Sequence, residues 1–239
     1  MNTRFAIVAL MSAAVAGIAA ADTIQMRYTG GGKGSVVRIY HPTATMNVFA
    51  GQMNQSLINP VGPQAQAIAG NHVTFCGDVA QYVTREYQDF TLTDIANIPN
   101  NTPVGADRAA AIRDIFNYAG INILTAEATN NAATAFQLAI WEVMHDYNPL
   151  SGLSSISLAS GNFRSTKTDG SALGSGIMAQ FNAFIGSIGA ESANRMSLVG
   201  LTHPGSQDQI LAMAIPAPGS AALAGLGTLC LAARRRRTA

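Results

Sequence analysis

The stretch from residue 132 to residue 147 has the clearest periodic pattern in the chain. Its apolar side chains recur at the 3.6-residue spacing of a helix: Ala133, Phe136, Ile140, Val143, Met144 and Tyr147. Pro149 limits the helix at its C-terminal end. On a helical wheel Gln137 lies at the edge of the apolar stripe, with Leu138, Glu142 and His145 on the other side. A glutamine that faces a core must have its amide hydrogen-bonded or must take part in chemistry.

The rest of the chain predicts an α+β fold. Two further helices are expected at 107–119 and 177–188, where apolar residues again recur at helical spacing. Strands are expected at 23–28, 35–40, 196–201 and 209–215, and the segment 73–83 is predicted to be a strand, alone or running into a short helix. The glycine-rich run 30–34 lacks the Gly-Lys-Ser/Thr ending of a phosphate loop, so it is interpreted as a hairpin turn.

Both ends of the chain are predicted to be processing segments. Residues 1–21 combine Arg4, an apolar run and three small residues, which is typical of a secretory signal peptide that ends before Asp22. Residues 216–239 begin with a proline motif, continue with the apolar run 221–233 and end with four arginines. That run is shorter than the roughly 20 residues of an ordinary membrane-spanning helix. We therefore expect a mature domain at 22–215 and a short membrane-embedded tail.

Charge and cysteine content narrow the function. Of 14 basic residues, five lie in the predicted signal and tail, which leaves nine against 13 acidic ones. The mature domain is thus weakly acidic and is not expected to bind nucleic acid. Of the two cysteines, Cys230 lies in the tail, so Cys76 is alone in the exported domain. Exported domains usually pair their cysteines, so a single one requires an explanation.

The tail resembles the PEP-CTERM class of bacterial sorting signals. The likeness rests on Pro216-Ala217-Pro218, with alanine in place of the usual glutamate, on the short apolar run and on the arginine cluster. This resemblance implies an envelope of the Gram-negative type and recognition by an exosortase-like transpeptidase. It also implies membrane insertion through 221–233 before processing, and delivery to the cell surface or extracellular matrix.

The middle of the chain resembles the thioester domains of bacterial surface proteins. Phe75-Cys76 matches the first half of that family's early motif, with Gly77 where an apolar residue is usual. The run Phe136-Gln137-Leu138-Ala139-Ile140-Trp141 matches the later motif in full. The resemblance spans residues 70–147 and implies a β-sandwich or barrel with a helical subdomain. It also implies an internal thioester between the thiol of Cys76 and the side-chain carbonyl of Gln137.

Such a bond forms when the thiol attacks the glutamine amide and ammonia leaves, and proximity must supply most of the driving force. A hydroxyl or amine of a surface protein or glycan then attacks the Gln137 carbonyl, which links the two molecules in one event without turnover. This chemistry predicts an adhesin-like capture protein, not an enzyme, with no cofactor. Phe75, Phe136 and Trp141 are candidates for keeping water from the bond.

Three other interpretations remain open from the sequence. Cys76 could act as a nucleophile with His72, His145 or His203, although no local signature supports this. His72 and Cys76 could bind a metal ion with His41 or His145, but the set lacks a paired ligand motif. The chain could also be a structural matrix protein in which Cys76 and Gln137 are core residues, or in which the thioester is only a stabilising crosslink.

Overall fold

The computed structural model describes residues 21–190 and 194–215, and these residues form a mixed α+β fold with one large antiparallel sheet. The strands are β1 (Thr23–His41), β2 (Ala44–Val61), β3 (Gly70–Cys76), β4 (Gln88–Thr93), β5 (Arg164–Thr166), β6 (Met196–His203) and β7 (Ser206–Ala214). The α-helices are α1 (Pro63–Ala67), α2 (Gly105–Ala119), α3 (Asn130–His145) and α4 (Ser175–Gly186). Short 3₁₀ helices lie at Ile95–Asn97 (η1), Ile121–Leu124 (η2) and Leu153–Ser155 (η3). The α+β class is therefore confirmed.

The strand pairings close on themselves. The sheet runs in the order β2-β3-β7-β6-β4-β1-β5, and β1 pairs with β2 as well. The first six of these strands therefore form a ring, and β5 extends the sheet beside β1. A small core made of Ile24, Met26, Leu57, Phe90 and Leu201, among others, lies inside this ring.

The predicted hairpin turn at residues 30–34 is wrong. β1 continues through the glycine run and pairs with β2 on both sides of it, and the chain reverses at Pro42 and Thr43 instead. The register shifts within the run, which lets the long hairpin bend. Gly34 and Gly51 face each other where the strands cross closely, and a Cβ on either would collide with backbone atoms of the other strand. The glycines therefore serve a bend and a close approach, not a turn.

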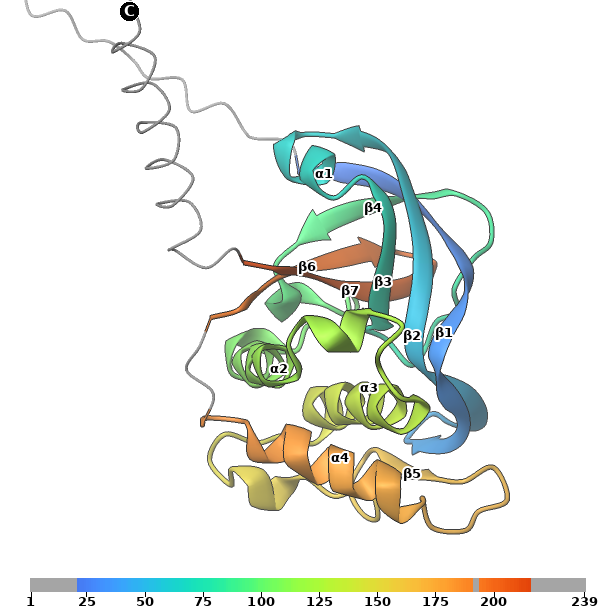
Figure 1. Ribbon diagram of the computed structural model, residues 1–239, viewed down its shortest axis with the longest axis vertical. Helices are drawn as coiled ribbons and strands as arrows, with labels where there is room; N and C mark the ends of the chain where they lie inside the picture. Colours follow the sequence, from blue (N-terminus) through green and yellow to red (C-terminus); the bar gives the residue numbers. More distant parts are fainter. Residues whose placement is uncertain (1–20, 191–193, 216–239) are drawn as a thin grey trace, which may run out of the picture.

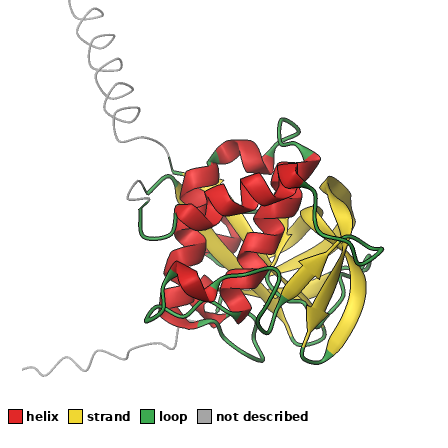
Figure 2. Ribbon diagram, turned by 90° about the horizontal axis from the view of Figure 1, so that it is seen from below, coloured by secondary structure: helices red, strands yellow, loops and turns green. Residues whose placement is uncertain are grey.

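Helices α2, α3 and α4 group on one side of the strands, with α3 closest to them (Figures 1 and 2). The predicted helices 107–119, 132–147 and 177–188 correspond to these three elements. The helical wheel placed Leu138 and Glu142 away from the apolar stripe of α3, but every residue from 133 to 144 is buried, including these two. α3 contacts β1 and β2 on one side and α2 and α4 on others, and the Glu142 side chain accepts a hydrogen bond from the Ser157 backbone.

The closing strands predicted at 196–201 and 209–215 are β6 and β7, which pair with each other. In contrast, the predicted strand 73–83 stops at Cys76. The chain turns there because the Asp78 carboxylate accepts a hydrogen bond from the Ala80 backbone, and residues 77–87 follow as an irregular segment. β4, which packs Phe90 and Leu92 inside the ring, was not predicted.

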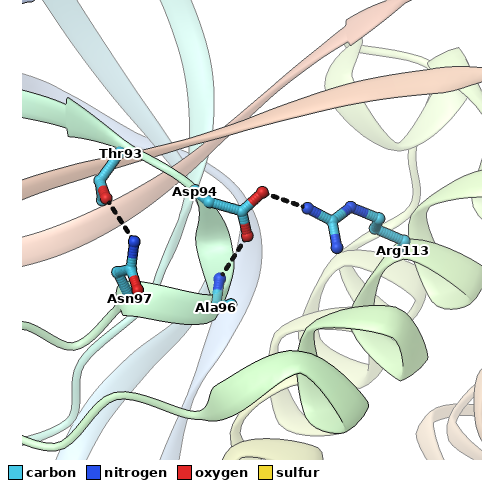
Figure 3. Close-up of polar contacts among 5 residues, drawn as sticks. All are labelled: Thr93, Asp94, Ala96, Asn97 and Arg113. Atoms are coloured by element: carbon cyan, nitrogen blue, oxygen red, sulfur yellow. Dashed lines mark hydrogen bonds and ion pairs between the residues drawn. The ribbon is translucent and has the colours of Figure 1, made fainter.

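A polar contact connects α2 to the turn that follows β4. The Arg113 guanidinium lies 2.7 Å from an Asp94 carboxylate oxygen, and Asp94 also accepts a hydrogen bond from the Ala96 backbone at the start of η1 (Figure 3). Asn97 in the same turn donates to the Thr93 hydroxyl. The ion pair is exposed, so it contributes at most about 1 kcal/mol. It helps to hold the turn that leads into Ile98, whose buried side chain packs next to Gly77.

The predicted signal peptide (all but Ala21) and the predicted sorting tail lie outside the described residues. Within residues 21–190 and 194–215, no helix combines the length and the hydrophobicity that crossing a bilayer requires.

Candidate functional site

Cys76 and Gln137 lie against each other in the core, at the junction of the strands and the helices. Cys76 is the last residue of β3, where the strand pairs with Gln209 of β7. Gln137 lies in the first half of α3, which begins at the Thr129 cap. Both residues are completely buried, although 61 positions separate them in the chain.

Two hydrogen bonds join the Gln137 side chain to the Cys76 backbone. The Cys76 N–H donates to Gln137 Oε1 at 2.8 Å, and Gln137 Nε2 donates to the Cys76 carbonyl at 3.0 Å. The amide thus completes the hydrogen bonding of the strand end and is itself fully paired. The first bond also polarises the Gln137 carbonyl, since an N–H placed at 2.8 Å would stabilise negative charge that develops on Oε1 during nucleophilic attack.

The thiol has its own polar contacts. Cys76 Sγ donates to the Asp78 carbonyl, and the Asp78 N–H lies 3.4 Å from the sulfur. Burial raises the pKa of the Cys76 thiol well above its usual range, and the nearby carboxyl groups of Asp78 and Asp208 add to this effect. The free thiol is therefore protonated at neutral pH, and its proton is available to a leaving nitrogen.

The three side chains predicted to shield the pair are all buried around it. Phe75 and Phe136 pack with their ring centroids 4.5 Å apart, and Phe116 and Phe184 extend the aromatic cluster from α2 and α4. Trp141 is 2% exposed and follows Gln137 by one turn of α3. The indole N–H has no hydrogen-bond partner in the described part of the chain.

The space for a side chain at Gly77 is limited by Ile98. A Cβ at this position would lie 2.7 Å from Cδ1 of Ile98 and 3.4 Å from the Asp208 carbonyl oxygen. The Gly77 N–H donates to that same carbonyl at 2.8 Å. The motif's usual apolar residue would therefore not fit here without moving Ile98.

Sequence analysis missed the polar residues that surround the pair. Asp208 is fully buried, and its carboxylate accepts hydrogen bonds from the backbones of Asn100 and His203. Burial raises the pKa of Asp208 to about 6 and also raises the pKa of Asp78. Gln207 donates from Nε2 to the carbonyls of Asp78 and Gln81. No local motif marks Gln207 and Asp208, because the fold brings them from the distant β6–β7 hairpin.

The histidines of the alternative interpretations lie elsewhere. His145 packs against His41 and stacks on Phe163, and His203 packs on Phe90 and accepts a hydrogen bond from the Gly205 backbone. His72 lines a separate surface depression between β2, β3 and β7. Within the described residues, none of the four histidines hydrogen-bonds to Cys76, and no group of three or more potential metal ligands occurs.

Comparison with known proteins adds no relative: no protein-family model, no curated protein and no solved structure matches this chain.

Proposed function

We propose that this protein is an exported surface or matrix protein whose ring of strands and helical layer form a thioester-type domain, with an internal Cys76–Gln137 thioester. The observation that carries the proposal is the pair of hydrogen bonds between the Gln137 amide and the Cys76 backbone. These bonds hold the amide of Gln137 beside the residue that bears the thiol, and bulk solvent does not reach either residue.

The bond-forming step follows from this arrangement. Sγ of Cys76 attacks Cδ of Gln137, the Cδ–Nε2 bond breaks, and the nitrogen leaves as ammonia with the thiol proton. The Cys76 N–H holds the carbonyl oxygen while the charge develops there. Because a buried thioester carries no ionisable thiol, its formation also removes a group whose charged form burial strongly disfavours.

The thioester is an acyl donor, and we propose that it captures a partner covalently. A nucleophile on a surface protein or glycan attacks Cδ of Gln137, the Cδ–Sγ bond breaks, and the nucleophile's proton passes to the sulfur. Nothing in this sequence of steps regenerates the thioester, so the protein acts once and is not an enzyme. In the proposed life cycle, residues 1–21 direct export, a sorting transpeptidase recognises residues 216–239, and 221–233 hold the chain in the membrane until processing.

Intact mass of the purified protein tests the bond. The wild-type protein should be lighter than its sequence by one ammonia, whereas Cys76→Ala and Gln137→Ala variants should have their full sequence masses. Peptide mapping after denaturation should find Cys76 protected from alkylation unless methylamine is added first. A full-mass wild-type protein with a freely alkylated Cys76 would eliminate the proposal.

A second function, a static crosslink, is favoured by the complete burial of both residues. A covalent bond that closes a loop of 61 residues would restrict the unfolded chain and stabilise the fold by a few kcal/mol, by analogy with a disulfide. Methylamine distinguishes the two functions. A capture site reacts in the folded protein, whereas a static crosslink reacts only after unfolding.

A further inference from the structure

A pocket lies beside the buried pair, between the β1–β2 hairpin, the irregular segment 77–83 and α3. Its volume is about 240 Å³. Trp141, Val79 and Gln207 are among the residues that line it, and the first two are almost completely buried. The pocket therefore reaches from the surface to the layer that covers Cys76.

Two lining residues connect the pocket to the buried pair. Trp141 follows Gln137 by one turn of α3. Gln207 donates to the Asp78 carbonyl at 3.0 Å, and that carbonyl is also the acceptor of the Cys76 thiol. A molecule in the pocket would thus contact the groups that surround the proposed bond.

The pocket combines aromatic rings with uncharged polar groups. Tyr28, Tyr82 and Trp141 contribute rings, and Asn47, Gln81 and Gln207 contribute amides. The described lining residues include no aspartate, glutamate, lysine, arginine or histidine. Aromatic faces suit the C–H faces of a sugar ring. Among the described residues, Asn47 uses only its Oδ1, which accepts from Arg38, so its Nδ2 can donate to a hydroxyl group, whereas Gln207 Nε2 already donates to two carbonyls.

The same composition disfavours a lysine as the partner. An ammonium group that enters this pocket would lose water and find no carboxylate to receive it, and its attraction to the aromatic rings, about 2 kcal/mol when desolvated, offsets only part of that cost. The volume lies just below the roughly 300–1,000 Å³ of pockets for drug-sized ligands. A single ring-sized unit therefore fits better than a folded peptide.

We propose that this pocket binds a neutral sugar unit of a glycan and that a hydroxyl of that sugar is the nucleophile for the thioester. This inference rests on the proposed function and names its partner class. The hydroxyl oxygen bonds to Cδ of Gln137, the Cδ–Sγ bond breaks, and the hydroxyl proton passes to the sulfur of Cys76. The product is an ester between Gln137 and the glycan, with a free thiol at Cys76.

Sugar binding can be tested without the thioester. Trp141 is the only tryptophan in the chain and lines the pocket, so its fluorescence reports occupancy directly. The Cys76→Ala protein should show a saturable fluorescence change with at least one member of a panel of neutral oligosaccharides of glucose, galactose, mannose and N-acetylglucosamine. It should show none with Nα-acetyl-lysine.

A matched pair of tyrosine variants locates the binding. Tyr82 is 76% exposed and lines the pocket, whereas Tyr118 is 48% exposed and lies on α2. Loss of one aromatic contact should weaken binding of the saccharide about three- to tenfold in Tyr82→Ala. Tyr118→Ala should bind as tightly as its parent. A panel without any saturable response, or equal losses in both variants, overturns the inference.

The covalent step is tested on the wild-type protein. Its mass should rise by the whole mass of the bound saccharide, and hydroxylamine should remove the adduct because it is an ester. If methylamine reacts but lysine forms the adduct and no saccharide does, the sugar inference fails while the thioester stands. If the wild-type protein never loses ammonia, the proposed function fails, and the fluorescence titration still decides whether the pocket binds sugar.

Discussion

The side-chain amide of Gln137 and the backbone of Cys76 form a reciprocal pair of hydrogen bonds, at 2.8 and 3.0 Å. α3 thereby provides the end of β3 with the backbone hydrogen bonds that a further strand would otherwise provide. The pairing has two consequences: it fixes the Gln137 carbonyl beside the thiol-bearing residue, and it satisfies two backbone groups that have no access to water.

Replacement of Gln137 should therefore cost more stability than replacement of Cys76. Gln137→Ala and Cys76→Ala both lack the thioester, but only the former leaves the Cys76 N–H and carbonyl without their partner. Each unpaired buried group costs about 1–3 kcal/mol, so with two such groups Gln137→Ala should be less stable than Cys76→Ala by about 2–6 kcal/mol in urea unfolding. Gln66→Ala, at an exposed position of α1, is the control. Equal stabilities of the two site variants would contradict this role.

Gly77 should tolerate no side chain as long as Ile98 is present. Gly77→Ala places a methyl group 2.7 Å from Cδ1 of Ile98, and such overpacking typically costs about 1–3 kcal/mol. Ile98→Val removes that δ-methyl, so the double variant should recover part of the loss in the unfolding free energy. Gly186→Ala, where a Cβ meets nothing within 4 Å, should leave the unfolding free energy unchanged or slightly higher. An unchanged midpoint for Gly77→Ala would show that Ile98 yields freely.

Local patterns predicted the elements whose burial follows a simple period. α2, α3 and α4 carry apolar residues at helical spacing, and β6 and β7 are short, mainly apolar segments near the end of the domain, so their positions follow from the sequence. The glycine run of β1 misled because glycine serves a turn and a close strand crossing equally well. The prediction that Glu142 lies away from the core was wrong, because a helical wheel contains no information about the segment 153–163, which covers this side chain.

The candidate site, too, was predicted from the sequence only in part. Motif resemblance singled out Cys76 and Gln137, and the fold places them in contact. The thioester itself remains a prediction. The polar residues Asp78, Gln207 and Asp208 could not be predicted, because β7 brings two of them to the end of β3 through pairings that no local pattern encodes. The pocket with its aromatic and amide lining has the same origin.

Gln207 should control how readily the buried bond meets a nucleophile. Its side chain donates to the carbonyls of Asp78 and Gln81, and its backbone N–H donates to that of Tyr82. Gln207→Ala removes the two side-chain bonds that hold the segment covering the thiol. Loss of about 1 kcal/mol per bond should raise the population of open segment roughly tenfold or more.

The rate of methylamine incorporation, followed by intact mass, measures this opening. Gln207→Ala should incorporate methylamine at least several times faster than the wild-type protein, and Gln66→Ala should match the wild type. A slower or unchanged rate in Gln207→Ala, with the thioester still formed, would show that access does not pass through the 77–83 segment.

Glu142 makes stability depend on pH. Its side chain is completely buried, one oxygen accepts from the Ser157 backbone, and the other has no partner in the described residues. The pKa of Glu142 is raised from 4.5 to about 8, mainly by burial and to a smaller extent by Asp146, against the lowering effect of the Ser157 hydrogen bond. The carboxyl is thus protonated in the folded protein at neutral pH and ionised in the unfolded chain.

The stabilisation that comes from the raised pKa of Glu142 is complete below about pH 4.5 and is lost as the pH rises through about 8. Asp208, whose raised pKa is about 6, and His145, whose pKa burial lowers from 6.5 to about 4, also contribute to the pH dependence near pH 6, but they do so equally in the wild-type protein and in Glu142→Gln. Between pH 6 and 8 the wild-type protein should therefore lose about 2 kcal/mol of unfolding free energy relative to Glu142→Gln, at about 1.4 kcal/mol per pH unit. Glutamine keeps an oxygen for the Ser157 N–H and does not titrate, so the difference between the two curves isolates the contribution of Glu142. Urea unfolding at several pH values measures both curves, and parallel curves would mean that Glu142 is already ionised in the folded state.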